Sequence, residues 1–382
     1  MTGPDANAIR VLHVVGGMNR GGVEAWLMDL LRHRSCAEYR FDFLTHAIGP
    51  TAYDGDILTM GSQIYPCLTP NRPLAYAQNF RRIVRTHGPF DVIHSHTYLF
   101  SGYVLWLAMC CDIPIRIAHI YPQVDHRRAT WLRAIVRFMA SRLIEKCATQ
   151  VLATSRMSLK AFQAHCRCAG LKPSVVYPFP NLTPFFREID REGARERFGF
   201  PTDKVIVTYV ARFTGHKNHR QIIRLANRLR HLPLHFVLAG SHGECQKEVQ
   251  QAAERSPNIQ MVLSLPDISE LLLASDAFFC PTLNEGFGRV VVEASAAGLI
   301  VVSSDLPTLR EACPPVFHPL MFPPDNDDEA SQRLAVLASH FIHRTGDLDS
   351  MVAQAKQQVR SMSIESSWPQ LARCYRPNQP RE

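Results

Sequence analysis

The chain has 382 residues, more than one typical domain and about what two domains of roughly 150–200 residues each would need. Its 46% hydrophobic and 20% charged residues are ordinary for a globular protein and exclude a disordered chain. The net charge of +8 excludes an acidic, self-repelling protein, and it is uneven: residues 1–180 have 20 basic against 11 acidic side chains, residues 181–382 have 22 against 23. This asymmetry predicts two domains with different partners.

The compartment can be predicted from what the sequence lacks. The first residues contain neither a basic nor an apolar segment, so no signal peptide is expected. The longest apolar-leaning run, residues 98–111, is shorter than the ~18–20 residues of a membrane-spanning helix. The eleven cysteines are odd in number and scattered, which disfavours a disulfide framework in a chain of this size. A reducing cytoplasm is therefore the expected setting.

Short β-branched runs alternate with helix-length segments along the first half of the chain. The first run, residues 9–15, ends at a glycine-rich loop, and a helical pattern follows over residues 23–32. Further strands are expected at residues 41–45, 63–68, 91–96, 115–120 and 151–154. Helices are expected between the later strands, at residues 74–86, 99–110 and 130–147. The alternation predicts a parallel sheet covered by helices.

The pattern breaks at residues 173–184, which contain four prolines. Proline lacks an N–H group and fixes φ, so this segment is predicted to be a linker. The alternation restarts at residues 204–210, and a last helix is expected at residues 363–376. Strands of the second half are expected at residues 235–239, 259–263, 277–280 and 299–303. The predicted fold class is α/β, with two tandem Rossmann-like doubly wound domains facing a cleft.

A glycine-rich loop, GGMNRGG at residues 16–22, stands between the first predicted strand and its helix. Glycines let backbone N–H groups approach a ligand closely, and the start of the helix adds partial positive charge, which suits a phosphate. The spacing differs from the G-x-G-x-x-G of dinucleotide-binding proteins, which disfavours a dehydrogenase. The alternative is a turn that serves only strand–helix packing.

A basic loop, RFTGHKNH at residues 212–219, follows the first strand of the second half. Arg212 and Lys217 bracket a Thr-Gly turn just before a predicted helix. Two cations together with helix N–H groups form a good clamp for a diphosphate. The alternative is a solvated basic loop.

The most specific motif is NEGFGRVVVE at residues 284–293, which follows an apolar strand. Glu285 is expected in the loop and Glu293 about two turns into the next helix, with the N–H groups of Gly286 and Gly288 between them. Such carboxylates could accept hydrogen bonds from sugar hydroxyls or act as a general acid and base. The alternative is two exposed carboxylates, but Glu293 has apolar sequence neighbours, where an unpaired carboxylate would be costly.

Two short motifs raise the alternative of a metal site. His94 and His96 would face one side of a strand, but no carboxylate or thiol ligand is evident beside them, which favours a role lining the ligand site. Asp54-Gly55-Asp56 has the Asp-x-Asp string of a manganese site, but it precedes a strand within a polar stretch, which favours a solvated turn. No metal and no other cofactor is expected.

In combination these motifs resemble glycosyltransferase family 4. GGMNRGGVE, the HSH of His94–His96, RFTGHKNH and the Glu-x7-Glu of EGFGRVVVE followed by AAG occur in this order in that family. The resemblance covers nearly the whole chain, and SIESSWPQLARCYR looks like the family's last helix. Members of the family are retaining enzymes with the GT-B fold, often found in bacterial exopolysaccharide and capsule synthesis.

The resemblance implies a donor site in the second domain. Arg212 and Lys217 would hold the diphosphate of a nucleotide-sugar, Glu293 the ribose, and Glu285 with the backbone of Gly286, Phe287 and Gly288 the sugar ring. It also implies domain boundaries: an acceptor-side domain over residues 1–178, a linker and donor-binding domain over 179–360, and a C-terminal helix and tail over 361–382 that crosses back to the first domain.

In the first domain, the resemblance implies that Gly21 and Gly22 close over the phosphate. His119 matches the position of a histidine near the reacting carbon, and His119 and Glu285 are the expected catalytic residues. The sequence here is IAHIYP, where IAHSHN is often found in relatives, so His119 or a neighbour could fill the role.

The remaining feature is the amphipathic basic segment of residues 127–146, in which arginines alternate with apolar side chains. It could rest on an anionic membrane, which would make the protein peripheral on the cytoplasmic face of the inner membrane, or it could be an ordinary surface helix packed on the sheet. No nucleic-acid partner is expected, because no binding motif accompanies the charge.

The predicted function is a hexosyltransferase-type retaining glycosyltransferase of polysaccharide biosynthesis. It would move a sugar from a nucleotide-sugar, with uridine favoured and a GDP-sugar left open, to a saccharide or polyprenyl-diphosphate-linked acceptor. Two alternatives remain: a sugar-nucleotide epimerase or hydrolase of the same fold, and a non-catalytic sugar-nucleotide-binding protein.

Overall fold

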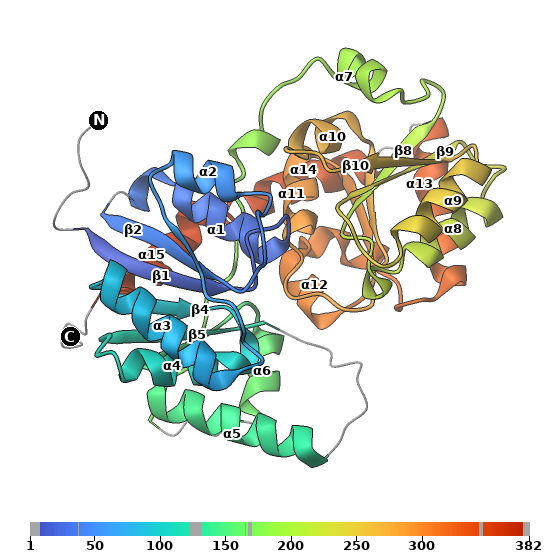
Figure 1. Ribbon diagram of the computed structural model, residues 1–382. Coiled ribbons are helices and arrows are strands. Elements are labelled where there is room, and N and C mark those ends of the chain that lie inside the picture. Colours follow the sequence, from blue (N-terminus) through green and yellow to red (C-terminus); the bar gives the residue numbers. More distant parts are fainter. Residues whose placement is uncertain are drawn as a thin grey trace. The chain divides into compact units, whose positions relative to one another are not determined.

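The computed structural model describes residues 8–36, 38–121, 131–164, 166, 170–343 and 347–376. The chain divides into two compact units, Met1–Pro178 with Ile364–Glu382 and Phe179–Ser363 (Figure 1). The chain therefore passes from the first unit to the second after Pro178 and returns to the first unit after Ser363. The boundaries expected from the sequence lie after residues 178 and 360.

The first unit contains a seven-stranded sheet in the order β3-β2-β1-β4-β5-β6-β7, and every neighbouring pair is parallel. Its strands are β1 (Ile9–Val15), β2 (Tyr39–Thr45), β3 (Ile64–Pro66), β4 (Val92–Ser95), β5 (Ile115–Ile120), β6 (Gln150–Ala153) and β7 (Ser174–Val175). Its helices are α1 (Gly22–Arg32), α2 (Asp54–Thr59), α3 (Pro73–His87), α4 (Ser101–Met109), α5 (Trp131–Cys147), α6 (Arg156–Gln163) and α15 (Ile364–Cys374). Short 3-10 turns lie at Arg34–Cys36 and Tyr98–Phe100.

Both faces of this sheet are buried, which explains why its strands are almost continuously apolar. Val11 and Leu12 are adjacent on β1 but belong to different clusters, because successive side chains of a strand point to opposite faces. One cluster includes Trp26 of α1 and Trp368 of α15, so the C-terminal helix completes the core of the first unit. The other cluster includes residues of α3 and α4.

Two predicted elements of the first unit are shortened or divided in the structure, which also adds α2, α6 and β7 to those predicted. The strand expected at residues 63–68 is only Ile64–Pro66, an edge strand whose last residue, Pro66, has no N–H to donate to a ladder. The helix expected at residues 99–110 is divided into the 3-10 turn and α4, which begins at Ser101.

The second unit contains a five-stranded parallel sheet in the order β10-β9-β8-β11-β12. Its strands are β8 (Val205–Val210), β9 (Leu234–Gly240), β10 (Ile259–Leu263), β11 (Ala277–Cys280) and β12 (Ile300–Ser303). Its helices are α7 (Arg191–Phe198), α8 (His219–Arg228), α9 (Gln246–Arg255), α10 (Ser269–Ala274), α11 (Arg289–Ala297), α12 (Pro307–Ala312), α13 (Asp327–His343) and α14 (Asp347–Val359). The 3-10 turns are Thr183–Phe185, Gly215–Lys217 and Pro315–Leu320.

The predicted α/β class with two doubly wound parallel sheets is confirmed. In each sheet the strand order reverses beside the first strand, between β1 and β4 in the first unit and between β8 and β11 in the second. Ligands of open α/β sheets bind at the carboxyl ends of the strands at such a switch point. Ligand-binding residues are therefore expected in the loops after these four strands. Within the described residues, no helix has both the length and the apolarity to cross a membrane.

Candidate functional site

The switch point of the second unit brings Lys217 and Glu285 together. Lys217 ends the 3-10 turn after β8, and Glu285 lies in the loop between β11 and α11. The Lys217 Nζ atom is 2.5 Å from Glu285 Oε2, and the two side chains keep 15% and 21% of their surface exposed. Residues 68 positions apart thus form one charged site that a ligand can reach.

Hydrogen bonds between the two loops fix this pair in place. The backbone N–H of Leu283 donates to the carbonyl of His216 at 2.8 Å, and the Thr282 hydroxyl donates to the same carbonyl at 3.1 Å. The Tyr209 hydroxyl, from β8, donates to the carbonyl of Lys217 at 3.1 Å. Hydrogen bonds to the backbone carbonyls of the β8 loop therefore hold the two loops of the site together.

The electrostatics of the β8 loop favour an anion. The side chain of Arg212 is exposed and forms no hydrogen bond or ion pair with the described residues. Burial, with Lys217 as the next cause, lowers the pKa of His216. The Glu244 carboxylate accepts a hydrogen bond from the backbone N–H of Gly215 at 2.9 Å, which lowers the pKa of Glu244. The N–H group of Gly215 thus already holds a carboxylate oxygen of the protein itself.

The loop before α11 depends on a glycine. Gly288 caps the helix with φ of +98°, and a Cβ atom there would lie 2.6 Å from Leu309 Cδ2. Only glycine accepts both the left-handed backbone and the close approach. Phe287 is buried against Phe179, while the N–H of Gly286 donates to the Oε1 atom of Glu285 at 3.1 Å.

Glu293 lies in a different environment from Glu285. Its side chain is 8% exposed within α11, and its Oε1 atom accepts a hydrogen bond from Arg289 Nη2 at 3.3 Å. Arg289 supplies the counter-charge that a buried carboxylate needs. The sequence interpretation missed Arg289, although its i,i+4 spacing from Glu293 was a usable signal.

In the first unit, Gly21 is the N-cap of α1 and Gly22 is its first residue. A Cβ atom on Gly21 would collide with the carboxylate of Glu24, in the first turn of the helix, whereas one on Gly22 would meet nothing within 4 Å. Gly22 is exposed. The backbone of Gly22 is therefore open to a ligand, while a Cβ atom on Gly21 would require the Glu24 side chain to move.

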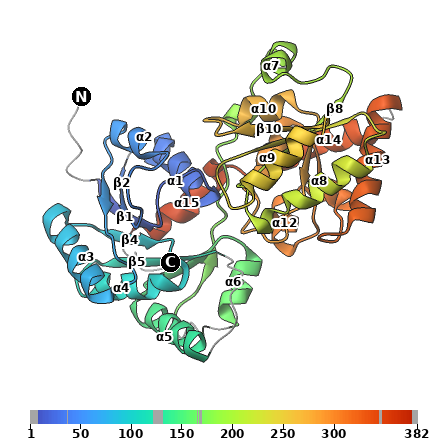
Figure 2. The same cartoon turned by 45° about the vertical axis from the view of Figure 1, so that its right-hand side comes forward.

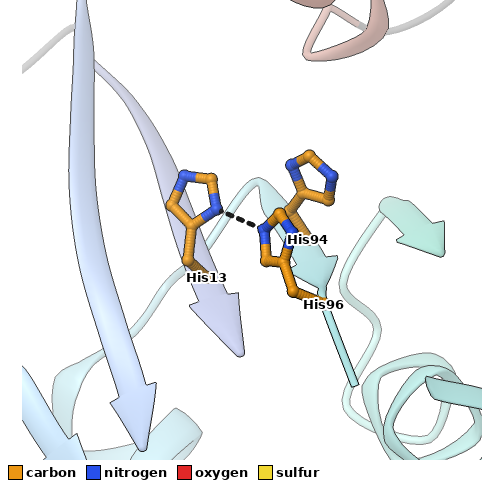
Figure 3. A group of neighbouring side chains, drawn as sticks. All are labelled: His13, His94 and His96. Atoms are coloured by element: carbon orange, nitrogen blue, oxygen red, sulfur yellow. Dashed lines mark hydrogen bonds between the residues drawn. The ribbon is translucent and has the colours of Figure 1, made fainter. Parts of the chain in front are cut away.

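His119 belongs to a cluster of four histidines at the switch point of the first unit. His13 lies in β1, His94 lies in β4, and His96 follows β4 directly (Figure 3). His119 lies in β5. His13 Nδ1 is 3.0 Å from His96 Nε2, and His94 Nε2 is 3.2 Å from His119 Nδ1. Trp26 covers the cluster, with its ring centroid 5.3 Å from that of His119.

Burial keeps these imidazoles neutral. It lowers the pKa of His13 and of His119 to about 3, and the pKa values of His94 and His96 fall well below their ordinary value for the same first cause. His119 has no exposed surface, whereas His96 is partly exposed. The sequence interpretation singled out His94, His96 and His119 but missed His13, whose position at the end of the first strand was the available signal.

Among the described residues, His13, His94 and His96 form the only group with metal-ligand spacing, with ligand atoms within 4.8 Å of one another. Both nitrogens of His94 already have partners, the Tyr375 hydroxyl at 2.8 Å and His119 at 3.2 Å. A metal ion would have to displace one of these bonds, so the geometry is that of a hydrogen-bonded network.

The two aspartates of the Asp-x-Asp string make separate contacts with other residues. Asp54 accepts a hydrogen bond from the backbone N–H of Thr51 at 2.7 Å, at the start of α2. Asp56 forms a 2.7 Å ion pair with Arg32. The two carboxylates therefore serve different local contacts in this structure.

The basic segment lies partly outside the described residues, which begin again at Trp131. The C-terminal part of α5 packs into the first unit, where Ser141, Ile144 and Cys147 are buried. Its N-terminal part leaves large apolar side chains in solvent, with exposed fractions of 72% for Trp131, 65% for Val136, 63% for Phe138, 61% for Met139 and 47% for Ile135. Helix α5 lies at the outside of the first unit, beyond α4 (Figures 1 and 2).

Two tandem doubly wound parallel sheets define a two-domain Rossmann-like protein of the GT-B class. The solved structures agree: Alr3699/HepE of Anabaena in complex with UDP-glucose is similar with a TM-score of 0.78 at 20% identity, over 96% of this chain and 98% of that one. WaaG, a glycosyltransferase involved in lipopolysaccharide biosynthesis, has a TM-score of 0.69 at 15% identity, over 95% and 98%.

The sequence comparisons identify the family. The "Glycosyltransferase Family 4" model matches residues 20–183, and the "Glycosyl transferases group 1" model matches residues 190–345. EpsF of Bacillus subtilis (strain 168), whose name describes a glycosyltransferase, is 32% identical over 309 residues, 78% of this chain and 79% of EpsF. The D-inositol 3-phosphate glycosyltransferase of Corynebacterium urealyticum is 22% identical over 97% of this chain and 94% of that protein. The chain belongs to glycosyltransferase family 4 and is a transferase enzyme.

Proposed function

We propose that this glycosyltransferase moves a sugar from a nucleotide-sugar to a hydroxyl of a saccharide or polyprenyl-diphosphate-linked acceptor, with retention of configuration, in polysaccharide biosynthesis. The observation that carries the donor assignment is the Lys217–Glu285 pair at the switch point of the second unit, with exposed Arg212 on the same loop. It offers cations for a diphosphate and a carboxylate for sugar hydroxyls in one place. The UDP-glucose bound by the Anabaena protein of similar fold favours a UDP-sugar over a GDP-sugar.

The donor groups divide by chemistry. Arg212 and Lys217 bind the diphosphate, and Glu293 accepts hydrogen bonds from the ribose. Glu285 binds the sugar ring together with the backbone around Gly286, Phe287 and Gly288. In the first unit, the backbone N–H of Gly22 at the start of α1 suits a phosphate oxygen, with Gly21 holding the turn.

Transfer expels a nucleoside diphosphate, so negative charge grows on the leaving oxygen as the glycosidic bond breaks. Arg212 and Lys217 stabilise this charge by fixed position, which is the role a metal ion has in other enzymes. The leaving phosphate accepts the proton of the acceptor hydroxyl. Turnover is then expected to survive exhaustive treatment with EDTA.

A panel of nucleotide-sugars tests the donor assignment. UDP-glucose, UDP-galactose, GDP-mannose and ADP-glucose are compared by thermal shift, since a ligand at a hundred times its Kd adds ~2.7 kcal/mol of stability. The donor that stabilises the protein is then incubated with acceptors and the products are analysed by NMR. A new glycoside with the donor's anomeric configuration supports the proposal. Free sugar or an epimerised donor without a new glycoside contradicts it in favour of a hydrolase or an epimerase.

We also propose that the N-terminal part of α5 docks on an anionic membrane surface, which would bring the enzyme to a lipid-linked acceptor on the cytoplasmic face. Five large apolar side chains of α5 are about half exposed or more. The described part of this helix has three cations, Arg137, Arg142 and Lys146, and one carboxylate, Glu145, which pairs with Arg142. Exposed apolar groups combined with cations suit the interface of anionic lipids.

Two matched valines test the docking surface. Val136 on α5 and Val336 on α13 are 65% and 52% exposed, and each is replaced by Glu. Flotation with phosphatidylglycerol vesicles is expected to fall about tenfold for Val136→Glu and to stay unchanged for Val336→Glu, with weaker flotation at higher salt. Equal flotation of both variants, or no binding of the wild type, means that α5 is an ordinary surface helix.

A further inference from the structure

An exposed carboxylate of the second unit lies against the loop that contains Arg212 and Lys217. Glu244 lies in the turn between β9 and α9, and its Oε1 atom accepts a hydrogen bond from the backbone N–H of Gly215 at 2.9 Å. Gly215 begins the 3-10 turn that Lys217 ends. A loop whose two cations suit an anion thus has a negative side chain bound to its own backbone.

Backbone contacts fix the β9 loop against the β8 loop. The N–H of Cys245 donates to the carbonyl of Phe213 at 2.9 Å, and the N–H of Phe213 donates to the carbonyl of Ser241 at 3.3 Å. A Cβ atom on Gly243 would lie 2.1 Å from the carbonyl oxygen of Phe213, so the two loops touch there. Glu244 lies between Gly243 and Cys245. Its side chain can rotate, but its backbone stays beside the β8 loop.

The charges of the donor site are balanced while Glu244 is ionised. Two cations, Arg212 and Lys217, are matched by two carboxylates, Glu285 and Glu244. Burial lowers the pKa of His216, so this imidazole adds no charge at pH 7. The backbone hydrogen bond described above lowers the pKa of Glu244, so its carboxylate is charged. Without the charge of Glu244, the site would have one net positive charge.

Transfer of the sugar increases the negative charge of the nucleotide. The bond between the sugar and the diphosphate breaks, the sugar forms a bond to the acceptor oxygen, and the departing phosphate takes up the proton of the acceptor hydroxyl. A terminal phosphate has a second pKa of about 6, so most of the product loses this proton to solvent at pH 7. The nucleoside diphosphate therefore has about one negative charge more than the nucleotide-sugar. A carboxylate held beside the diphosphate repels the product more strongly than the donor.

We propose that Glu244 is a specificity-determining residue that lowers the affinity for the nucleoside diphosphate more than that for the nucleotide-sugar, and so promotes release of this product. The proposal rests on the proposed function, in which Arg212 and Lys217 bind the diphosphate. Glu244 is exposed, so water and salt screen its charge and the expected effect is moderate. Release of product limits turnover in many enzymes, and the repulsion acts on that step.

The alternative role of Glu244 is to hold the Gly215 turn in the conformation that binds the ligand. The two roles predict changes of opposite sign. Loss of an anchor weakens the binding of both nucleotides, whereas loss of a repelling charge strengthens it. Glutamine separates the two roles, because its amide oxygen can still accept the hydrogen bond from the N–H of Gly215 while the charge is absent.

The test compares the binding of UDP and of UDP-glucose to the full-length protein by isothermal titration calorimetry, without an acceptor. At about 0.1 M salt, Glu244→Gln is expected to lower the Kd of UDP about fourfold and that of UDP-glucose about twofold. Both gains are expected to disappear at about 1 M salt, where the Debye length is about 3 Å. An unchanged ratio of the two Kd values, or weaker binding of both nucleotides, overturns the proposal.

The matched control is Glu254→Gln, which removes the same charge from the other end of α9. Glu254 is exposed, accepts a hydrogen bond from Gln250 Nε2 at 3.2 Å and does not contact the β8 loop. It lies eight positions after Gln246, the first residue of α9, or ~12 Å along the helix axis. Both Kd values are expected to stay unchanged in this variant. An equal gain in Glu254→Gln would show an effect of net charge alone and contradict the proposal.

A second variant separates this proposal from the proposed function. Arg212→Ala is expected to weaken the binding of UDP and of UDP-glucose. If it does and Glu244→Gln has no effect, the role of Glu244 is overturned and the donor site is retained. If the wild type binds neither nucleotide, or Arg212→Ala binds both as the wild type does, the donor assignment is wrong and the role of Glu244 is overturned with it.

Discussion

The two sheets have the same kind of switch point but fill it with opposite chemistry. On β1, β4 and β5, the first unit places four neutral, largely buried imidazoles joined by hydrogen bonds. Between β8 and β11, the second unit places a partly exposed ion pair, Lys217 with Glu285, beside exposed Arg212. One topology therefore supports a neutral network in one unit and a charged site in the other.

The difference shows what each switch point can do. Charges that keep contact with solvent can exchange a protein partner for an anionic ligand, because neither charge is left buried without compensation. Buried neutral imidazoles resist protonation and hold a fixed pattern of donors and acceptors. Substitutions should therefore affect catalysis most in the second unit and the dependence of stability on pH most in the first.

The largest expected effect is that of Lys217→Ala. Loss of the cation should lower kcat about 10²–10³-fold, the cost of removing one group that stabilises charge in the transition state. Stability should change little, since Glu285 keeps 21% of its side-chain surface exposed and can be solvated. Turnover and thermal melts are measured together, with Lys217→Arg as the control that keeps the charge. Near-wild-type turnover in Lys217→Ala would remove Lys217 from the donor site.

The next effect is the loss of stability in acid. His13 and His119 have pKa values lowered to about 3 in the folded state, while the unfolded chain takes up protons near the ordinary value of 6.5. The stabilisation that these neutral histidines give to the folded state is complete above pH 6.5, and it is lost as the pH falls toward 3. The slope is about 1.4 kcal/mol per pH unit for each histidine.

Urea unfolding between pH 7 and pH 5 measures this slope. In His13→Phe, which keeps an aromatic ring beside Phe41 and Phe43, the slope should decrease by about one proton. A free energy of unfolding that is independent of pH over this range would show that the imidazoles are not held neutral by the fold.

The smallest effects come from two glycines, one in each unit. Gly288→Ala should lower the free energy of unfolding by about 1–3 kcal/mol, because the left-handed backbone and Leu309 both oppose a Cβ atom. Gly22→Ala should change it by less than about 0.5 kcal/mol, since a Cβ atom there meets nothing within 4 Å. Chemical denaturation compares the two. A loss of turnover in Gly22→Ala at unchanged stability would support its place at the phosphate.

Part of the site could be predicted from local sequence and part could not. Lys217 and Glu285 each lie in a recognisable loop, so their chemistry could be predicted. Their 2.5 Å contact could not, because it joins loops after two strands that are neighbours only in the folded sheet. Glu293 was correctly suspected of needing a partner, and Arg289 supplies it one turn away. Tyr375 carried no signal, because its partner lies 281 positions earlier in the chain.

The sequence by itself determined the α/β alternation, the two doubly wound sheets and the family, because strand and helix patterns and loop motifs are local properties. The tertiary structure alone decided which of the candidate residues meet. Four histidines from three strand ends become one neutral cluster because parallel strands end at the same edge of a sheet. Tyr375, directly after the last helix, is brought to His94 by packing and not by sequence proximity.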